Sequence, residues 1–124
     1  MKKILYAEDT EDIRSVTSRF LKRWGFTEEN GYKVLICKSG QDAENIYFSE
    51  KPIRAAILDN TMPPGKTGLE IAKMIKHDDP DVKTCLATGD RSIEKEEYVD
   101  DLLEKPFSLN ESLLPVLKKY LEAE

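Results

Sequence analysis

The chain has 124 residues, of which 40% are hydrophobic and 35% charged, and its formal net charge is −5 at pH 7. We therefore expect one soluble domain, residues 1–124, built around a single core. A net acidic chain with scattered lysines and arginines lacks the basic face that nucleic acids require, so we expect no nucleic-acid partner. No apolar run approaches the roughly 20 residues that cross a bilayer. Because the N-terminus also turns acidic too early for a signal peptide, we expect no membrane partner and a cytoplasmic location.

The first part of the chain predicts strand, helix, strand and helix in that order. Residues 3–7 form a short apolar run typical of a strand, and the acidic pair Glu8-Asp9 follows it. Thr10 is a candidate N-cap for a helix that extends to about residue 25, with acids in its first turn. Residues 34–37 predict a second strand, and Ser39 can cap a second helix. The predicted inward face of the first helix consists of Ile13, Val16, Phe20, Leu21 and Trp24.

The middle of the chain predicts a strand buried on both faces. Residues 54–58 are an apolar run without helical period between Pro52 and Asp59, which is typical of such a strand. In isolation, Asp59 would most simply begin a turn. Thr67 and Glu70 then form a capping box at the start of a third helix.

The last part of the chain predicts two more strands and a final helix. Residues 82–87 are the fourth strand, ending at Thr88, and a shorter fifth strand lies around Leu102 and Leu103. Ser108 begins a second capping-box pattern, and Pro115 should kink or tighten the first turns of the helix that follows. Cys37 and Cys85 are expected to be buried apolar residues, and His77 a surface residue that binds no metal.

Alternating strands and helices predict right-handed βαβ crossovers and a parallel sheet covered on both faces. Five strands in one domain are typical of a flavodoxin-like, doubly wound α/β fold with the strand order 2-1-3-4-5. In such a fold the carboxyl ends of the strands meet at one edge. The side chains that follow the predicted strands therefore converge there: Glu8, Asp9, Asp59, Thr88 and Lys105.

Three carboxylates at one edge repel each other by roughly 4 kcal/mol per pair at about 4 Å and an effective dielectric near 20. Protonation, Lys105 or a bound cation must offset this repulsion. An open site of oxygen ligands is suited to Mg²⁺, which also binds phosphates. With the Thr88 hydroxyl and the Lys105 charge, the site has the groups that phosphoryl transfer requires. Asp59 would then be the nucleophile and form an acyl phosphate.

These residues resemble, along the whole chain, the receiver domain of bacterial two-component response regulators, and most of all stand-alone receivers of the chemotaxis type. Glu8-Asp9 match the family's acidic pair, Asp59 its phosphoacceptor, Thr88 its switch hydroxyl, and residues 105–107 its Lys-Pro-Phe signature. The resemblance implies Mg²⁺ held by Asp9, Asp59 and the Thr61 carbonyl, with Glu8 acting through water. It also implies a sensor His kinase or His phosphotransfer protein as phosphodonor, and a signalling domain that catalyses only its own phosphorylation and dephosphorylation.

The sequence departs from the family pattern at four places. The acidic pair is Glu-Asp rather than the commoner Asp-Asp, residues 62–68 form a loop one residue longer than usual, and residues 26–30 resemble an insertion. Between Thr88 and Lys105 the chain is short by a turn or more of helix. Since residues 91–97 contain a single apolar side chain, we expect a short, mobile or absent fourth helix.

Leu102 stands where many receivers carry an aromatic switch residue. A leucine has no ring to rotate between two states, so signalling is expected to depend on Thr88 and on ordering of residues 89–99.

Three functions are compatible with the sequence. The first is a single-domain response regulator that acts through an unknown downstream protein or passes the phosphoryl group on. The second is a receiver excised from a hybrid kinase or multidomain regulator. The third, a small phosphatase with Asp59 as nucleophile, is disfavoured because Thr61 replaces its second acid.

Overall fold

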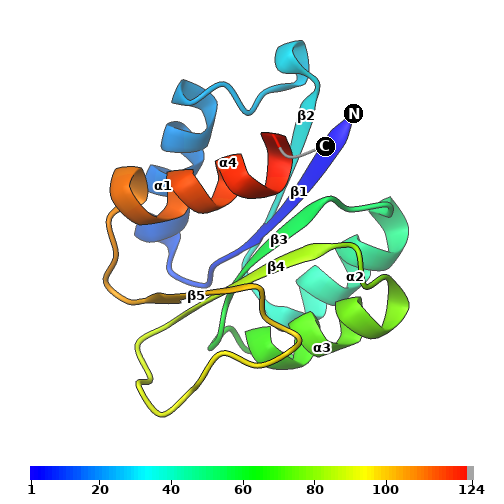
Figure 1. Ribbon diagram of the computed structural model, residues 1–124, viewed down its shortest axis with the longest axis vertical. Coiled ribbons are helices and arrows are strands. Elements are labelled where there is room, and N and C mark those ends of the chain that lie inside the picture. The colour runs from blue at the N-terminus through cyan, green and yellow to red at the C-terminus, as the bar shows by residue number, and fades with distance from the viewer. Residues whose placement is uncertain (123–124) are drawn as a thin grey trace.

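The computed structural model describes residues 1–122 as five strands and four α-helices that alternate except between the last two strands (Figure 1). Two short turns complete it, a 3₁₀ turn at Glu28–Asn30 and a π-helical turn at Leu109–Leu113. The main elements are β1 (Lys2–Ala7), α1 (Glu11–Arg23), β2 (Tyr32–Cys37), α2 (Gly40–Glu50), β3 (Ala55–Asp59), α3 (Gly68–Asp78), β4 (Lys83–Thr88), β5 (Asp101–Glu104) and α4 (Leu114–Glu122).

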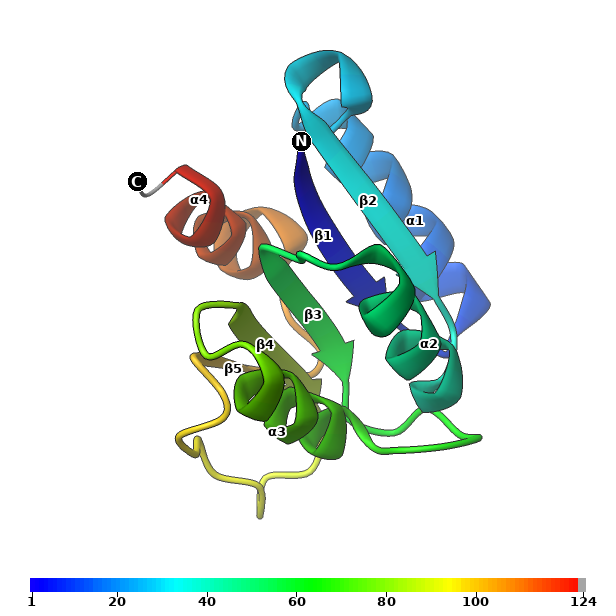
Figure 2. The same cartoon turned by 90° about the vertical axis from the view of Figure 1, so that its right-hand side faces the viewer.

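All five strands are parallel and lie in the order β2-β1-β3-β4-β5, which confirms the predicted flavodoxin-like fold. The helices α1 and α4 cover one face of the sheet, and α2 and α3 cover the other (Figure 2). All five residues of β3 are buried, as expected for the central strand of a sheet covered on both sides. None of the helices in the described part of the chain is long and apolar enough to span a bilayer.

The structure confirms where the predicted helices start, but not every predicted cap hydrogen bond and not the predicted effect of Pro115. The Thr67–Glu70 capping box is complete, whereas the predicted box at Ser108 forms by half, through the hydrogen bond that the Ser108 hydroxyl accepts from the backbone N–H of Glu111. Thr10 occupies the N-cap position of α1, but its side chain makes no cap hydrogen bond. The helical segment starts with a π turn, which is wider rather than tighter than an α-helical turn, and α4 begins at Leu114, one residue before Pro115.

The connection between β4 and β5 contains no helix, which confirms the predicted loss of the fourth helix. The connection still packs against the core formed by α2, α3 and the sheet. Val99 is fully buried there, while Ile93 and Tyr98 are partly buried against the same cluster. The Tyr98 ring lies 5.5 Å from the Lys73 ammonium and 6.0 Å from the His77 ring. These few apolar side chains therefore cover α3 in place of a helix.

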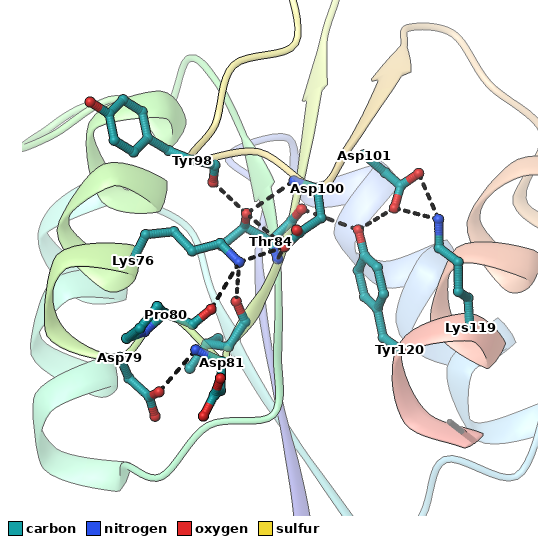
Figure 3. A network of polar contacts seen from close by, with 11 residues as sticks. Lys76, Asp79, Pro80, Asp81, Thr84, Tyr98, Asp100, Asp101, Lys119 and Tyr120 are labelled. Carbon is teal, nitrogen blue, oxygen red and sulfur yellow. Dashed lines mark hydrogen bonds and ion pairs between the residues drawn. The ribbon is translucent and has the colours of Figure 1, made fainter. Parts of the chain in front are cut away.

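A polar network fixes the end of this connection at the start of β5 (Figure 3). The Asp100 carboxylate accepts hydrogen bonds from the Lys76 ammonium at 2.7 Å and from the backbone N–H of Thr84 at 2.8 Å. The fully buried Thr84 hydroxyl donates to the backbone carbonyl of Tyr98. Residues 98–100 are thus tied to α3 and β4, which sets where β5 begins.

Candidate functional site

The five predicted site residues lie together at the carboxyl edge of the sheet. Asp59 and Thr88 are the last residues of β3 and β4, Glu8 and Asp9 follow β1, and Lys105 follows β5. The register pairs Asp59 with Ala87 and Thr88 with Glu104, so the ends of the three strands β3, β4 and β5 are level. Glu8, Asp59 and Thr88 are only 3–6% exposed, whereas Asp9 is open to solvent.

The Lys105 ammonium links two of the carboxylates. Its Nζ lies 3.0 Å from Glu8 Oε1 and 3.0 Å from Asp59 Oδ1. Burial acts to lower the pKa of Lys105, but the hydrogen bonds with Asp59 and Glu8 outweigh it and raise that pKa. One ammonium therefore serves two buried carboxylates, and the site keeps an excess of negative charge.

The third carboxylate belongs to Asp9. Oxygen atoms of Glu8, Asp9 and Asp59 lie within 4.8 Å of one another. The pKa of Asp59 is raised to about 7, chiefly by burial and then by the contact with Asp9, against the opposing effect of Lys105. Burial also acts to raise the pKa of Asp9, but the contacts with Asp59 and Glu8 and the Lys105 charge hold it below its usual range. The site therefore favours either a proton or an added cation.

The donor set is suited to Mg²⁺. It consists of carboxylate oxygens alone, and the exposed position of Asp9 leaves room for water ligands, which Mg²⁺ usually retains. A bound cation would offset the repulsion that a single lysine leaves uncompensated. Thr61 lies on the exposed loop after β3, and its carbonyl is a ligand only by the resemblance to the receiver family.

The loop after β3 is held against the start of α2. The backbone N–H of Gly40 donates to the Met62 carbonyl at 2.8 Å, and that of Gln41 donates to the Pro64 carbonyl at 3.0 Å. A Cβ atom on Gly40 would lie 1.8 Å from the Lys66 carbonyl oxygen, so only glycine allows this approach. The loop is thus held in place by close backbone packing against α2.

Two residues that position the site are absent from the sequence-based prediction. The Arg14 guanidinium donates to the Glu8 carbonyl at 2.9 Å and to the Asp9 carbonyl at 3.4 Å, which holds the acidic pair from α1. The Asn60 side chain accepts a hydrogen bond from the backbone N–H of Leu69, which joins the end of β3 to the start of α3. The sequence gives one indication of this role, which is the position of Arg14 directly after the acidic first turn of the helix.

An apolar hollow of about 610 Å³ lies directly beside Lys105. Ile13 and Val16, predicted to face inward, are instead 43% and 39% exposed there. The buried positions of α1 are Thr17 and Leu21. The helix therefore packs against the sheet with the stripe that contains these two side chains. The hollow is lined by Asp12, Ile13, Val16, Thr17, Lys105, Pro106, Phe107 and Leu109.

Comparisons with known proteins agree on one family. The family model for the response regulator receiver domain matches residues 4–115. The chain is 31% identical to the response regulator receiver protein CpdR of Brucella abortus, over 99% of this chain and all of that protein. It is 30% identical to a putative NtrX-like response regulator of Rickettsia bellii, of which it covers 24%.

Solved structures lead to the same family. The response regulator TrrA of Thermotoga maritima, in complex with Mg²⁺ and beryllium fluoride, is 31% identical with a TM-score of 0.77, over 98% of this chain and all of that one. The receiver domain of DrrB, activated by BeF₃, is 27% identical with a TM-score of 0.76, over 99% of both chains.

Replacing Asp59 by asparagine is expected to stabilise the metal-free protein at pH 8 by about 2 kcal/mol and to have little effect at pH 4. Burial raises the pKa of Asp59 in the folded state from its ordinary 3.8 to about 7. The folded state therefore binds this proton more tightly than the unfolded state, and ionisation weakens the fold as the pH rises from about 4 to 7. Urea denaturation with EDTA at several pH values measures the effect.

The control is Asp78→Asn, because the fold lowers the pKa of Asp78 whereas it raises that of Asp59. The Tyr47 hydroxyl donates to Asp78 at 2.7 Å, and this hydrogen bond lowers the pKa of Asp78 despite the opposing effect of desolvation. This substitution should lower stability at pH 8. A stability difference between wild type and Asp59→Asn that is the same at pH 4 and pH 8 would contradict the assignment.

Proposed function

The chain belongs to the response regulator receiver domain family, and we propose that it is a single receiver domain, residues 1–124, phosphorylated on Asp59. The proposed donors are a sensor His kinase or a His phosphotransfer protein, and Mg²⁺ is the proposed cofactor. The observation that supports this most strongly is Lys105 Nζ at 3.0 Å from Asp59, beside two further carboxylates and a strand-end threonine. This set contains a nucleophile, a metal site and two groups for a phosphoryl oxygen.

In the proposed reaction, an Asp59 carboxylate oxygen attacks the phosphorus atom of phosphohistidine. The new O–P bond gives an acyl phosphate as the N–P bond breaks, and the released imidazole takes a proton from solvent. Asp59 must be ionised to attack, and Lys105 favours its ionised form. Bound Mg²⁺, held by Asp9, Asp59 and the Thr61 carbonyl with Glu8 through water, would supply charge neutralisation for the phosphoryl oxygens. Lys105 and the Thr88 hydroxyl then bind phosphoryl oxygens of the product. Thr61 and Asp90, which flank the site, would influence the rate of its hydrolysis.

The proposed docking surface for the phosphodonor is the hollow beside Lys105. Its exposed apolar side chains, Ile13 and Val16, lie on the same edge of the molecule as Asp59. A donor that covers them would exclude water from the site while it presents its histidine. The hollow therefore supplies a reason for two apolar residues to remain at the surface of α1.

The proposed signal is a change in residues 89–99, which follow Thr88 directly. Its readout would be altered binding of a downstream protein in the cytoplasm, or transfer of the phosphoryl group to another histidine. Leu102 is half-buried against the α3 side of the sheet and offers no aromatic ring for the switch.

The two curated relatives leave open whether this receiver stands alone or belongs to a larger protein, because the chain spans all of CpdR but 24% of the NtrX-like protein. The mass of the natural gene product distinguishes a stand-alone regulator from a receiver within a larger protein.

Incubation with acetyl phosphate and Mg²⁺ should add one phosphoryl group to the wild type and none to Asp59→Asn, as measured by intact mass. Addition should be lost in EDTA, since the metal neutralises the phosphoryl charge. Asp78→Asn, which removes a carboxylate far from the sheet edge, serves as the control and should be labelled like the wild type. Equal labelling of Asp59→Asn and wild type would overturn the assignment.

The double variant Ile13→Ser/Val16→Ser should slow phosphoryl transfer from a phosphorylated His phosphotransfer protein by about tenfold, because an apolar contact worth about 1.4 kcal/mol is lost. Labelling by acetyl phosphate should not change, since a small donor needs no docking surface. Phe48→Ser is the matched control, because Phe48 is 45% exposed on α2. If both variants slow transfer equally, the docking surface lies elsewhere.

Beryllium fluoride with Mg²⁺ should change the amide resonances of residues 89–99 and increase their protection from hydrogen exchange. The physical reason is that a phosphoryl oxygen bonded to Thr88 would restrain the chain that follows it, which has no helix of its own. The Asp59→Asn variant under the same conditions is the control. Resonances of residues 89–99 that stay unchanged in the wild type would refute this mechanism.

A further inference from the structure

The negative charge of the chain is concentrated in one segment. Of its 24 acidic and 19 basic residues, seven acidic and two basic ones lie in residues 90–104. This segment therefore accounts for the whole net charge of −5, and the rest of the chain is balanced. It consists of the connection without a helix and strand β5, so the formal charge is concentrated in one continuous stretch of chain.

Strand β5 is at the end of the sheet, and its outer side is not paired with any strand among residues 1–122. All four of its residues are at least partly exposed. The connection that leads into it runs as irregular chain beyond the sheet rather than as a helix (Figures 1 and 2). An edge strand with free backbone N–H and C=O groups can pair with an added strand from another chain.

The start of this edge is held rigidly. The Lys119 ammonium lies 2.8 Å from the Asp101 carboxylate, and the Tyr120 hydroxyl donates to it at 2.6 Å (Figure 3). Together with the contacts of Asp100, these bonds fix the first residue of β5 to α4 on one side and α3 on the other. A partner strand would therefore meet a preformed template, which lowers the entropy cost of binding.

The acidic side chains of residues 90–104 are only partly neutralised by basic residues of the same chain. Arg91 pairs with Glu104 at 2.7 Å, but both side chains are more than half exposed. Glu94 and Glu96 are exposed and make no ion pair among residues 1–122. A second copy of the chain would bring the same acidic segment against itself, and the like charges would oppose such pairing.

We propose that the outer edge of β5 binds an extended, basic segment of a partner protein as a sixth strand of the sheet. Backbone hydrogen bonds to β5 would supply the strand pairing, and lysines or arginines of the segment would pair with Glu94, Glu96 and Glu104. This binding goes beyond the proposed phosphorylation and does not require it, so it is measured on the unphosphorylated chain.

The test is an NMR titration of the labelled full chain with a synthetic peptide of alternating lysine and valine. A peptide of alternating lysine and proline is the matched control, because it has the same charge but too few N–H groups for a strand. The Lys-Val peptide should shift the amides of residues 101–104 and bind more weakly as salt increases. Equal binding of the Lys-Pro peptide, shifts centred outside residues 90–104, or no binding would overturn the proposal.

Two double variants with the same charge change sharpen the test. Glu94→Gln/Glu96→Gln should weaken the Lys-Val peptide about fivefold, through loss of two exposed ion pairs. Glu28→Gln/Glu29→Gln, at the exposed 3₁₀ turn before β2, should leave the affinity unchanged. Equal weakening in both variants would indicate attraction by net charge alone and overturn the proposal. Sedimentation of the wild type should show a monomer, and a dimer with shifted β5 amides would assign the edge to a second copy instead.

Discussion

The repulsion among Glu8, Asp9 and Asp59 is the constraint on which the site depends. Parallel strands that end level with one another place these carboxylates within 4.8 Å, and one ammonium is shared by two of them. A fold that only had to be stable would not gather three acids at one edge, because each pair costs free energy at neutral pH. The same excess charge provides the affinity for a cation. In the proposed function, the same charge would also supply Asp59 as a nucleophile held in place by strands on both sides. The instability of the metal-free site and its proposed reactivity would then have one cause.

Most of the fold could be predicted because its signals are local. The alternation of short apolar runs with helical periods, the buried run before Asp59 and the Thr67–Glu70 capping box each depend on residues close in sequence. The convergence of the site residues could also be predicted, since the carboxyl ends of parallel strands lie at the same edge of the sheet. The errors concern tertiary contacts. Ile13 and Val16 have the spacing of a buried face, but which stripe of α1 is covered depends on how the helix is rotated against the sheet. The width of the turn before Pro115 likewise depends on where the helix packs, and the role of Arg14 on a backbone carbonyl that the sequence does not place.

The missing helix shows how a family fold can tolerate the loss of an element. A helix between β4 and β5 would cover α3 with a continuous apolar stripe, which residues 91–97 do not contain. Three side chains perform part of that role, with Val99 fully buried and Ile93 and Tyr98 half-buried. The buried Thr84 hydroxyl then satisfies the backbone carbonyl of Tyr98, and the Asp100 carboxylate satisfies the backbone N–H of Thr84 in β4. Residues 98–100 are held by these hydrogen bonds, and residues 90–97 are exposed except for Ile93. In the proposed mechanism, the exposed part of the connection would respond to Thr88 while β5 keeps its register.

The charged connection and the reactive edge are parts of one continuous stretch of chain. Thr88 precedes the connection, Lys105 follows β5, and the register pairs Thr88 with Glu104. A phosphoryl group on Asp59 would add negative charge beside Lys105, which directly follows the segment that accounts for the formal net charge. A basic strand on β5 would therefore be attracted more strongly to the phosphorylated form than to the unphosphorylated form. Linkage then requires the reciprocal effect, since a partner that prefers the phosphorylated state stabilises that state by the same factor. With Leu102 at the position proposed for the switch residue, electrostatic coupling of this kind would need no rotating ring, only the short path from Asp59 through Thr88 and Lys105 to the edge of the sheet.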